Sequence, residues 1–200
     1  MKNGFRAFDS DMHVYDPADL YEKYMNPKWG DRIPRGQRNG KHGRVEFQLG
    51  GGTKLRAISE VIDHGQKLVA DRYGFAVERD YDVVSKVQAM DMEGLDVGVL
   101  FRTSPLHCDD SFEAEYANDL CRAWNSWIAD FCKENPSRLK ASALITLHDV
   151  DLAIEEVRRV VNELEVTALS LETARINSTG LHKAMATIFA LGWPKNLFAT

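Results

Sequence analysis

Three polar side chains that could do chemistry stand at every second position near the start of the chain: Asp9, Asp11 and His13. They follow an apolar entry, Phe5 to Phe8, which is typical of a short strand. Side chains at alternate positions of a strand share one face, so we expect the three to point the same way. The Cα atoms of Asp11 and His13 would then lie about 6.5 to 7 Å apart, within reach of one metal ion.

A carboxylate oxygen and an imidazole nitrogen suit a divalent metal, and we predict zinc first with manganese as the alternative. Two ligands make a poor site, because a catalytic zinc usually has three protein ligands and a water. The remaining ligands would have to come from later strand ends. The other interpretation is that the strand simply ends in solvated Asp and His side chains.

The elements that must position these groups alternate between strand and helix. Segments such as LDVGVLF (95–101) are continuously apolar, which is typical of strands buried on both faces of a parallel sheet. Ser111 is a plausible N-cap for the longest helix. The expected strands are 4–9, 95–101, 139–147 and 166–171, and the expected helices are 55–72, 82–93, 112–134, 149–164 and 181–191.

Residues 14–53 are predicted to be largely irregular. Within them RGQRNGKHGR (35–44) has the composition of a basic, turn-rich loop, and VEFQLGGGTKL suggests a small hairpin that turns at Gly50, Gly51 and Gly52.

Alternating strands and helices predict an α/β fold with a parallel sheet covered by helices. Two architectures of this kind are compatible with the pattern so far: the doubly wound open sheet and the eight-stranded barrel. The chain has neither a GxGxxG after its first strand nor a P-loop, so a phosphate-binding site is disfavoured.

The composition narrows the class of partner. The chain has 200 residues with 44% hydrophobic and 28% charged residues, and its formal net charge is −5. These values indicate one globular domain, argue against nucleic acid and membrane partners, and leave the cytoplasm as the default compartment. Its three cysteines, Cys108, Cys121 and Cys132, form no CxxC pair and are predicted to be reduced.

The opening stretch AFDSDMHVYDPADLYEKYM (7–25) also carries a resemblance. It resembles the start of the amidohydrolase-related family, which includes relatives of aminocarboxymuconate-semialdehyde decarboxylase, through an acidic-x-His motif followed by DPADLY (16–21). The resemblance continues through VQAMDMEGLDVGVLFRTSPL (87–106) and through 115–164, so that about 160 residues are covered.

The resemblance implies part of a TIM-like (β/α)8 barrel, with a metal at the carboxyl ends of the strands and Asp11 and His13 at the first-strand ligand positions. It further implies a hydrolase or non-oxidative decarboxylase of a small, often aromatic, carboxylic acid. Arg102 and His148 end later strands and are candidates for binding the substrate. For Arg102 a structural ion pair, and for His148 a place in a loop beside a helix cap, are the alternatives. The cluster HCDD (107–110) is interpreted as a polar loop.

The chain departs from the family pattern after about residue 166. Only four of eight strands can be counted, and residues 1–200 are therefore predicted to form one incomplete barrel domain with an insertion at 14–53 and a divergent tail at 166–200. We expect a truncated enzyme. The alternative is an inactive half-barrel that serves as an interaction or dimerising module, because open sheet edges favour pairing with another chain, including a homo-oligomer.

Overall fold

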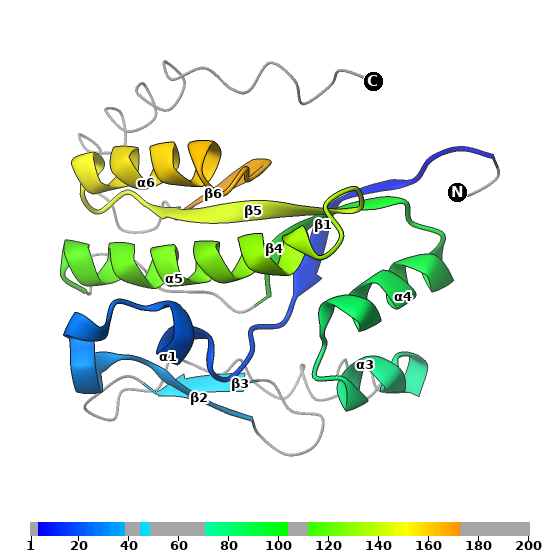
Figure 1. Cartoon of the computed structure of the whole chain (residues 1–200), viewed down its shortest axis with the longest axis horizontal. Coiled ribbons are helices and arrows are strands. Elements are labelled where there is room, and N and C mark those ends of the chain that lie inside the picture. The colour runs from blue at the N-terminus through cyan, green and yellow to red at the C-terminus, as the bar shows by residue number, and fades with distance from the viewer. Residues whose placement is uncertain (1–3, 39–44, 49–70, 104–111, 173–200) are drawn as a thin grey trace.

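A four-stranded parallel sheet forms the centre of the computed structural model, which describes residues 4–38, 45–48, 71–103 and 112–172 (Figure 1). Strands that follow one another in this sheet along the chain are also neighbours in space. This sequential order, without the reversal found in a doubly wound sheet, is the order of a barrel segment. The strands, in their spatial order, are β1 (Phe8–Val14), β4 (Val97–Arg102), β5 (Leu139–Thr146) and β6 (Ala168–Glu172).

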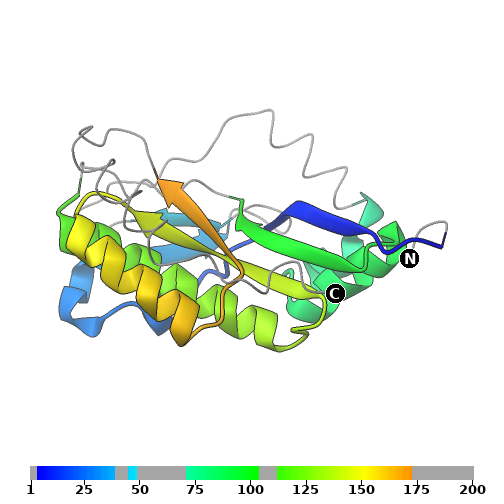
Figure 2. The same ribbon diagram turned by 90° about the horizontal axis from the view of Figure 1, so that it is seen from above.

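Helices cover one face of this sheet, and α5 (Ala114–Lys133) and α6 (Val150–Asn162) lie side by side on it (Figure 2). The longest helix carries apolar side chains at helical spacing, and three of them, Leu120, Trp124 and Ile128, have no exposed surface. Helix α5 packs against β5, and these side chains belong to one main core together with the buried positions of β4 and β5.

The ends of the helices follow local rules. Helix α4 (Val83–Glu93) begins at the predicted place, because the Asp82 carboxylate accepts a hydrogen bond from the Ser85 amide at 2.8 Å, and it ends at Gly94 with φ of 72°. Asp149 caps α6 in the same way. The expectation for α5 was wrong, since Glu113 and not Ser111 occupies its N-cap position.

The first strand lies further along the chain than the expected range of 4–9. Phe5 and Phe8, which suggested a buried start, are 77% and 62% exposed. The strand instead includes the polar residues up to Val14, because backbone pairing with β4 runs as far as Val14 opposite Arg102. The apolar residues of the sequence therefore placed β1 too early in the chain, because its extent is set by its pairing with β4.

The segment that was expected to be irregular contains regular elements: α1 (Leu20–Tyr24), a 3-10 helix (Pro27–Arg32), and strands β2 (Arg35–Arg38) and β3 (Val45–Gln48). The two strands pair with each other in antiparallel register. β3 thus pairs with an upstream strand, while the turn and second strand of the predicted hairpin lie outside the described residues. Gly50, Gly51 and Gly52 lie outside the described residues, as do the expected helix at 181–191 and nearly all of that at 55–72.

Leu20 and Tyr21 of α1 are fully buried, and Trp29 donates a hydrogen bond from Nε1 to Asp119 of α5 at 2.7 Å. These contacts fasten the segment to the sheet-covering helix. A short helix, α3 (Gly74–Glu78), precedes α4. In the described part of the chain, no helix combines the length and apolar character that a membrane span requires.

Candidate metal centre

A β-bulge in β1 decides which way the candidate ligands point. The pairing runs from Asp9 opposite Gly98 to Met12 opposite Leu100, so three steps along β1 match two along β4. Because Gly98 and Leu100 share a face, Asp9 and Met12 share a face as well. The expectation that Asp9 lies on the same face as Asp11 and His13 was therefore wrong, and the extra residue is the reason.

Asp11 and His13 point away from the face that the helices cover. Their side chains are 81% and 53% exposed, and His13 Nε2 lies 3.7 Å from Asp11 Oδ1. The other ring nitrogen, Nδ1, lies 2.9 Å from the backbone carbonyl oxygen of Arg102. A carbonyl can only accept, so Nδ1 carries the proton, and in the neutral ring Nε2 presents its lone pair beside the carboxylate.

This arrangement fits a divalent ion. Histidines that bind metals commonly donate their second ring N–H to a carbonyl or carboxylate, which fixes the tautomer. Two ligand atoms that each lie about 2.1 Å from one ion lie roughly 3.4 Å apart at a tetrahedral angle. The observed 3.7 Å is close to that separation, and the exposed carboxylate is free to adjust its rotamer.

The described residues supply only this pair. In residues 4–38, 45–48, 71–103 and 112–172, no group of three or more His, Cys, Asp or Glu side chains is arranged to hold a metal ion. A site with the usual three protein ligands would need at least one from outside these ranges. The cluster at 107–110 lies there.

Arg102 lies on the other face of its strand. It stands opposite Val14, and its side chain is only 4% exposed. Its Nε and Nη2 donate to Asp16 Oδ2 at 2.8 and 2.6 Å, while Trp124 Nε1 donates to Asp16 Oδ1 at 3.1 Å. This is the structural ion pair that the sequence left open, and it gives Asp16 of the DPADLY motif a function in the core. Substrate binding by Arg102 receives no support from this geometry.

His148 lies two residues beyond the end of β5, directly before the Asp149 cap of α6. Its Nδ1 is buried and has no hydrogen-bond partner among the described residues. Such an atom is free to bind a ligand group, so the substrate-binding role of His148 stays a prediction. His148 does not form a group of three potential ligands with Asp11 and His13.

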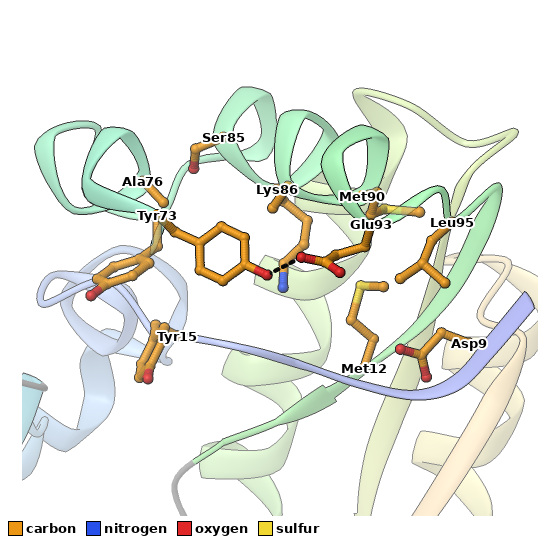
Figure 3. A pocket seen from close by; sticks show the side chains of 12 residues that line it. Asp9, Met12, Tyr15, Tyr73, Ala76, Ser85, Lys86, Met90, Glu93 and Leu95 are labelled. Carbon is orange, nitrogen blue, oxygen red and sulfur yellow. Dashed lines mark hydrogen bonds between the residues drawn. The ribbon is translucent and has the colours of Figure 1, made fainter. Parts of the chain in front are cut away.

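A cavity of about 280 Å³ lies behind β1, between the strand and helices α3 and α4 (Figure 3). Asp9 and Met12 line it from the strand, and Lys86 of α4 enters it. Burial lowers the pKa of Lys86 to about 8, although the charge of Asp9 acts against that shift. Sequence reasoning missed Lys86, because a lysine in an amphipathic helix carries no local signal of burial.

Lys86 contacts one of the candidate ligands from the side of the sheet on which α4 lies. Its Nζ donates to the backbone carbonyl oxygen of His13 at 2.6 Å. Further along the same cavity, the Tyr73 hydroxyl donates to the Glu93 carboxylate, which also binds Arg72 (Figure 3). The acidic and basic side chains of this cavity are thus largely engaged with protein groups.

Comparison with known proteins supports the resemblance found in the sequence. No family model matches the chain. Over 110 residues the chain is 33% identical to gamma-resorcylate decarboxylase from Rhodococcus jostii (strain RHA1), a match that covers 54% of this chain and 33% of that protein.

Solved structures share the fold. An amidohydrolase from Mycobacterium avium subsp. paratuberculosis K-10 superposes with a TM-score of 0.69 at 18% identity, over 96% of this chain and 58% of that one. A 5-carboxyvanillate decarboxylase from Novosphingobium aromaticivorans DSM 12444, complexed with manganese and 4-hydroxy-3-methoxy-5-nitrobenzoic acid, gives a TM-score of 0.61 at 16% identity, over 96% and 50%.

These matches confirm two predictions: the likeness to part of the amidohydrolase-related family, and a partial (β/α)8 barrel of about four βα units. The chain spans a third of the length of the curated relative and between half and 58% of the two solved relatives.

Proposed function

We propose that this chain provides the first-strand part of the active site of a metal-dependent carboxy-lyase that acts on a small aromatic carboxylic acid. The observation that carries the proposal is the pair of Asp11 and His13, with His13 Nδ1 held by the Arg102 carbonyl and Nε2 directed toward the carboxylate. The names of the decarboxylases among the relatives favour decarboxylation over hydrolysis.

The chain's own residues are assigned one task, which is to hold and orient a divalent metal ion. Asp11 contributes an anionic oxygen and His13 a neutral nitrogen, a ligand set that suits either zinc or manganese. A divalent ion held there would polarise a substrate carboxylate or an adjacent hydroxyl oxygen. Manganese is supported by the solved 5-carboxyvanillate decarboxylase, and zinc stays a prediction from ligand chemistry.

The test is metal binding followed by turnover. Calorimetric titration of the purified chain with Mn²⁺ and with Zn²⁺ is expected to show one bound ion per chain. Asp11→Asn and His13→Gln should each weaken binding by at least 100-fold, whereas His148→Gln should leave metal affinity unchanged. Release of CO₂ from gamma-resorcylate and from 5-carboxyvanillate then measures the activity. Equal metal affinity in all four proteins would refute the proposal.

A second candidate rests on the sheet edges. Among the described residues, β1 and β6 each pair with one strand only, so each presents an edge. The alternative function, an interaction or dimerising module, predicts a concentration-dependent dimer in light scattering and no change when Asp11 or His13 is replaced. A monomer that binds metal would exclude it.

A further inference from the structure

The edge of β1 that faces away from β4 carries the backbone amide of Asp11 and the backbone carbonyl of His13, the two candidate ligands. The Val14 carbonyl accepts a hydrogen bond from the Thr103 amide at 3.3 Å, so it faces β4. Backbone groups alternate in direction along a strand, and the His13 carbonyl therefore faces the opposite edge. The amide of Asp11 faces that edge as well.

Two side chains from the helix-covered face satisfy these groups. Asp9 Oδ1 accepts the hydrogen bond of the Asp11 amide at 2.9 Å, and Lys86 Nζ donates to the His13 carbonyl oxygen at 2.6 Å. Figure 3 shows Lys86 extending from α4 toward β1, with Asp9 further along the strand. The backbone of the Asp11–His13 pair is thus held between one carboxylate and one ammonium group.

Of Asp9 and Lys86, Lys86 constrains the backbone of the ligand pair more strongly, because it joins two separate elements. Asp9 acts within its own strand, whereas Lys86 ties a strand to a helix that is 73 residues away along the chain. A hydrogen bond from a charged donor is roughly twice as strong as one between neutral groups. His13 is then held twice, at its ring by the Arg102 carbonyl and at its backbone by Lys86.

We propose that Lys86 is a positioning residue for the metal centre: from behind the strand it fixes the backbone of His13 so that Nε2 points toward Asp11. The inference rests on the proposed function, since it concerns the same two ligands. It assigns Lys86 no contact with metal or substrate.

Three variants test this function against a structural one. Lys86→Met removes the donor and keeps the length and apolar stem, and Lys86→Arg restores a cationic donor. Lys140→Met is the matched control, because Lys140 Nζ also donates to a backbone carbonyl, that of Pro136, at 2.6 Å near the start of β5. Lys86→Gln, which is shorter but polar, replaces the Met variant if that protein does not fold.

The first measurement is Mn²⁺ affinity by calorimetry. Loss of a group that orients a metal ligand typically weakens binding by about 10- to 100-fold, and we expect this for Lys86→Met. Lys86→Arg should recover most of the affinity, and Lys140→Met should bind as the unchanged protein does. Circular dichroism melting checks that all variants are folded.

The second measurement needs no metal. Nitrogen-15 NMR of the His13 ring, assigned by loss of its signals in His13→Gln, should show a single Nδ1–H tautomer in the unchanged protein and a mixture of tautomers in Lys86→Met. Unaltered Mn²⁺ affinity together with an unaltered His13 spectrum in Lys86→Met would overturn the proposal. If the unchanged protein binds no Mn²⁺, the proposed function fails, and the tautomer measurement alone decides whether Lys86 orients His13.

Discussion

Removing the charge of Asp16 should destabilise the fold strongly, whereas removing the charge of Arg102 at the same time should add no further loss. The side chains of Asp16 and Arg102 are each 4% exposed. Two nitrogens of Arg102 donate hydrogen bonds to the same carboxylate oxygen of Asp16. Asp16→Asn keeps an acceptor for Trp124 Nε1 and abolishes the charge. Arg102→Met keeps most of the side-chain volume.

The magnitude follows from the cost of a lone buried charge. Breaking a buried ion pair by removing one partner costs about 3–5 kcal/mol, whereas replacing both partners is often close to neutral. We expect Asp16→Asn and Arg102→Met each to lose about 3 kcal/mol or more, and the double variant to lose no more than either single one. The coupling energy would then be about 3 kcal/mol.

Urea unfolding followed by tryptophan fluorescence measures these differences. With a slope of about 1–3 kcal/mol per molar urea, a loss of 3 kcal/mol moves the midpoint by about 1–3 M. If the double variant loses the sum of the two single losses within about 0.5 kcal/mol, the two groups act independently and the reasoning is refuted.

Three further predictions concern buried groups elsewhere. Burial raises the pKa of the Cys132 thiol to about 12, so roughly one thiol in ten thousand is ionised at pH 8, and peptide mapping after iodoacetamide treatment should find this cysteine labelled only in urea. In Gly98→Ala the new Cβ would lie 2.8 Å from Met12 Cε, at the flexible end of that side chain, so the change should cost only about 1 kcal/mol in urea unfolding; the same substitution in a Met12→Ala background should cost almost nothing. Glu156→Gln removes the fully buried carboxylate that binds Arg159 at 2.7 and 2.8 Å and Asn125 at 2.7 Å, and thermal unfolding should show a loss of about 3–5 kcal/mol; a loss below about 1 kcal/mol would contradict this.

Helices and buried strands could be predicted from the sequence because their signals are local. Asp82 and Gly94 mark the two ends of α4 by capping chemistry, and the spacing of Leu120, Trp124 and Ile128 marks the buried side of α5. The antiparallel pair β2–β3 could not be predicted in the same way. Its pairing partner is chosen by contacts such as the hydrogen bond from the Gly36 amide to the Ala18 carbonyl, at 3.1 Å.

The site was predictable only in its ligand types. The sequence indicated Asp11 and His13 through residue chemistry and spacing, and the structure brings them within 3.7 Å of each other. The sequence did not reveal the bulge that moves Asp9 to the other face of β1, because an extra residue in a strand has no signature of its own. Nor did it reveal Lys86, whose contact with His13 joins residues 73 positions apart.

The extra residue of β1 also fixes where this strand can change in length. Ser10 and Asp11 together stand opposite the single residue between Gly98 and Leu100, and Ser10 is exposed. A chain that lacked Ser10 would form a regular strand and still direct Asp9 to the helices and Asp11 and His13 to the open side. A deletion between Asp11 and His13, by contrast, would move one of the two ligands to the other face. Alignments of this chain with relatives should therefore allow a one-residue gap at position 10, and a gap between the two ligands would misplace one of them.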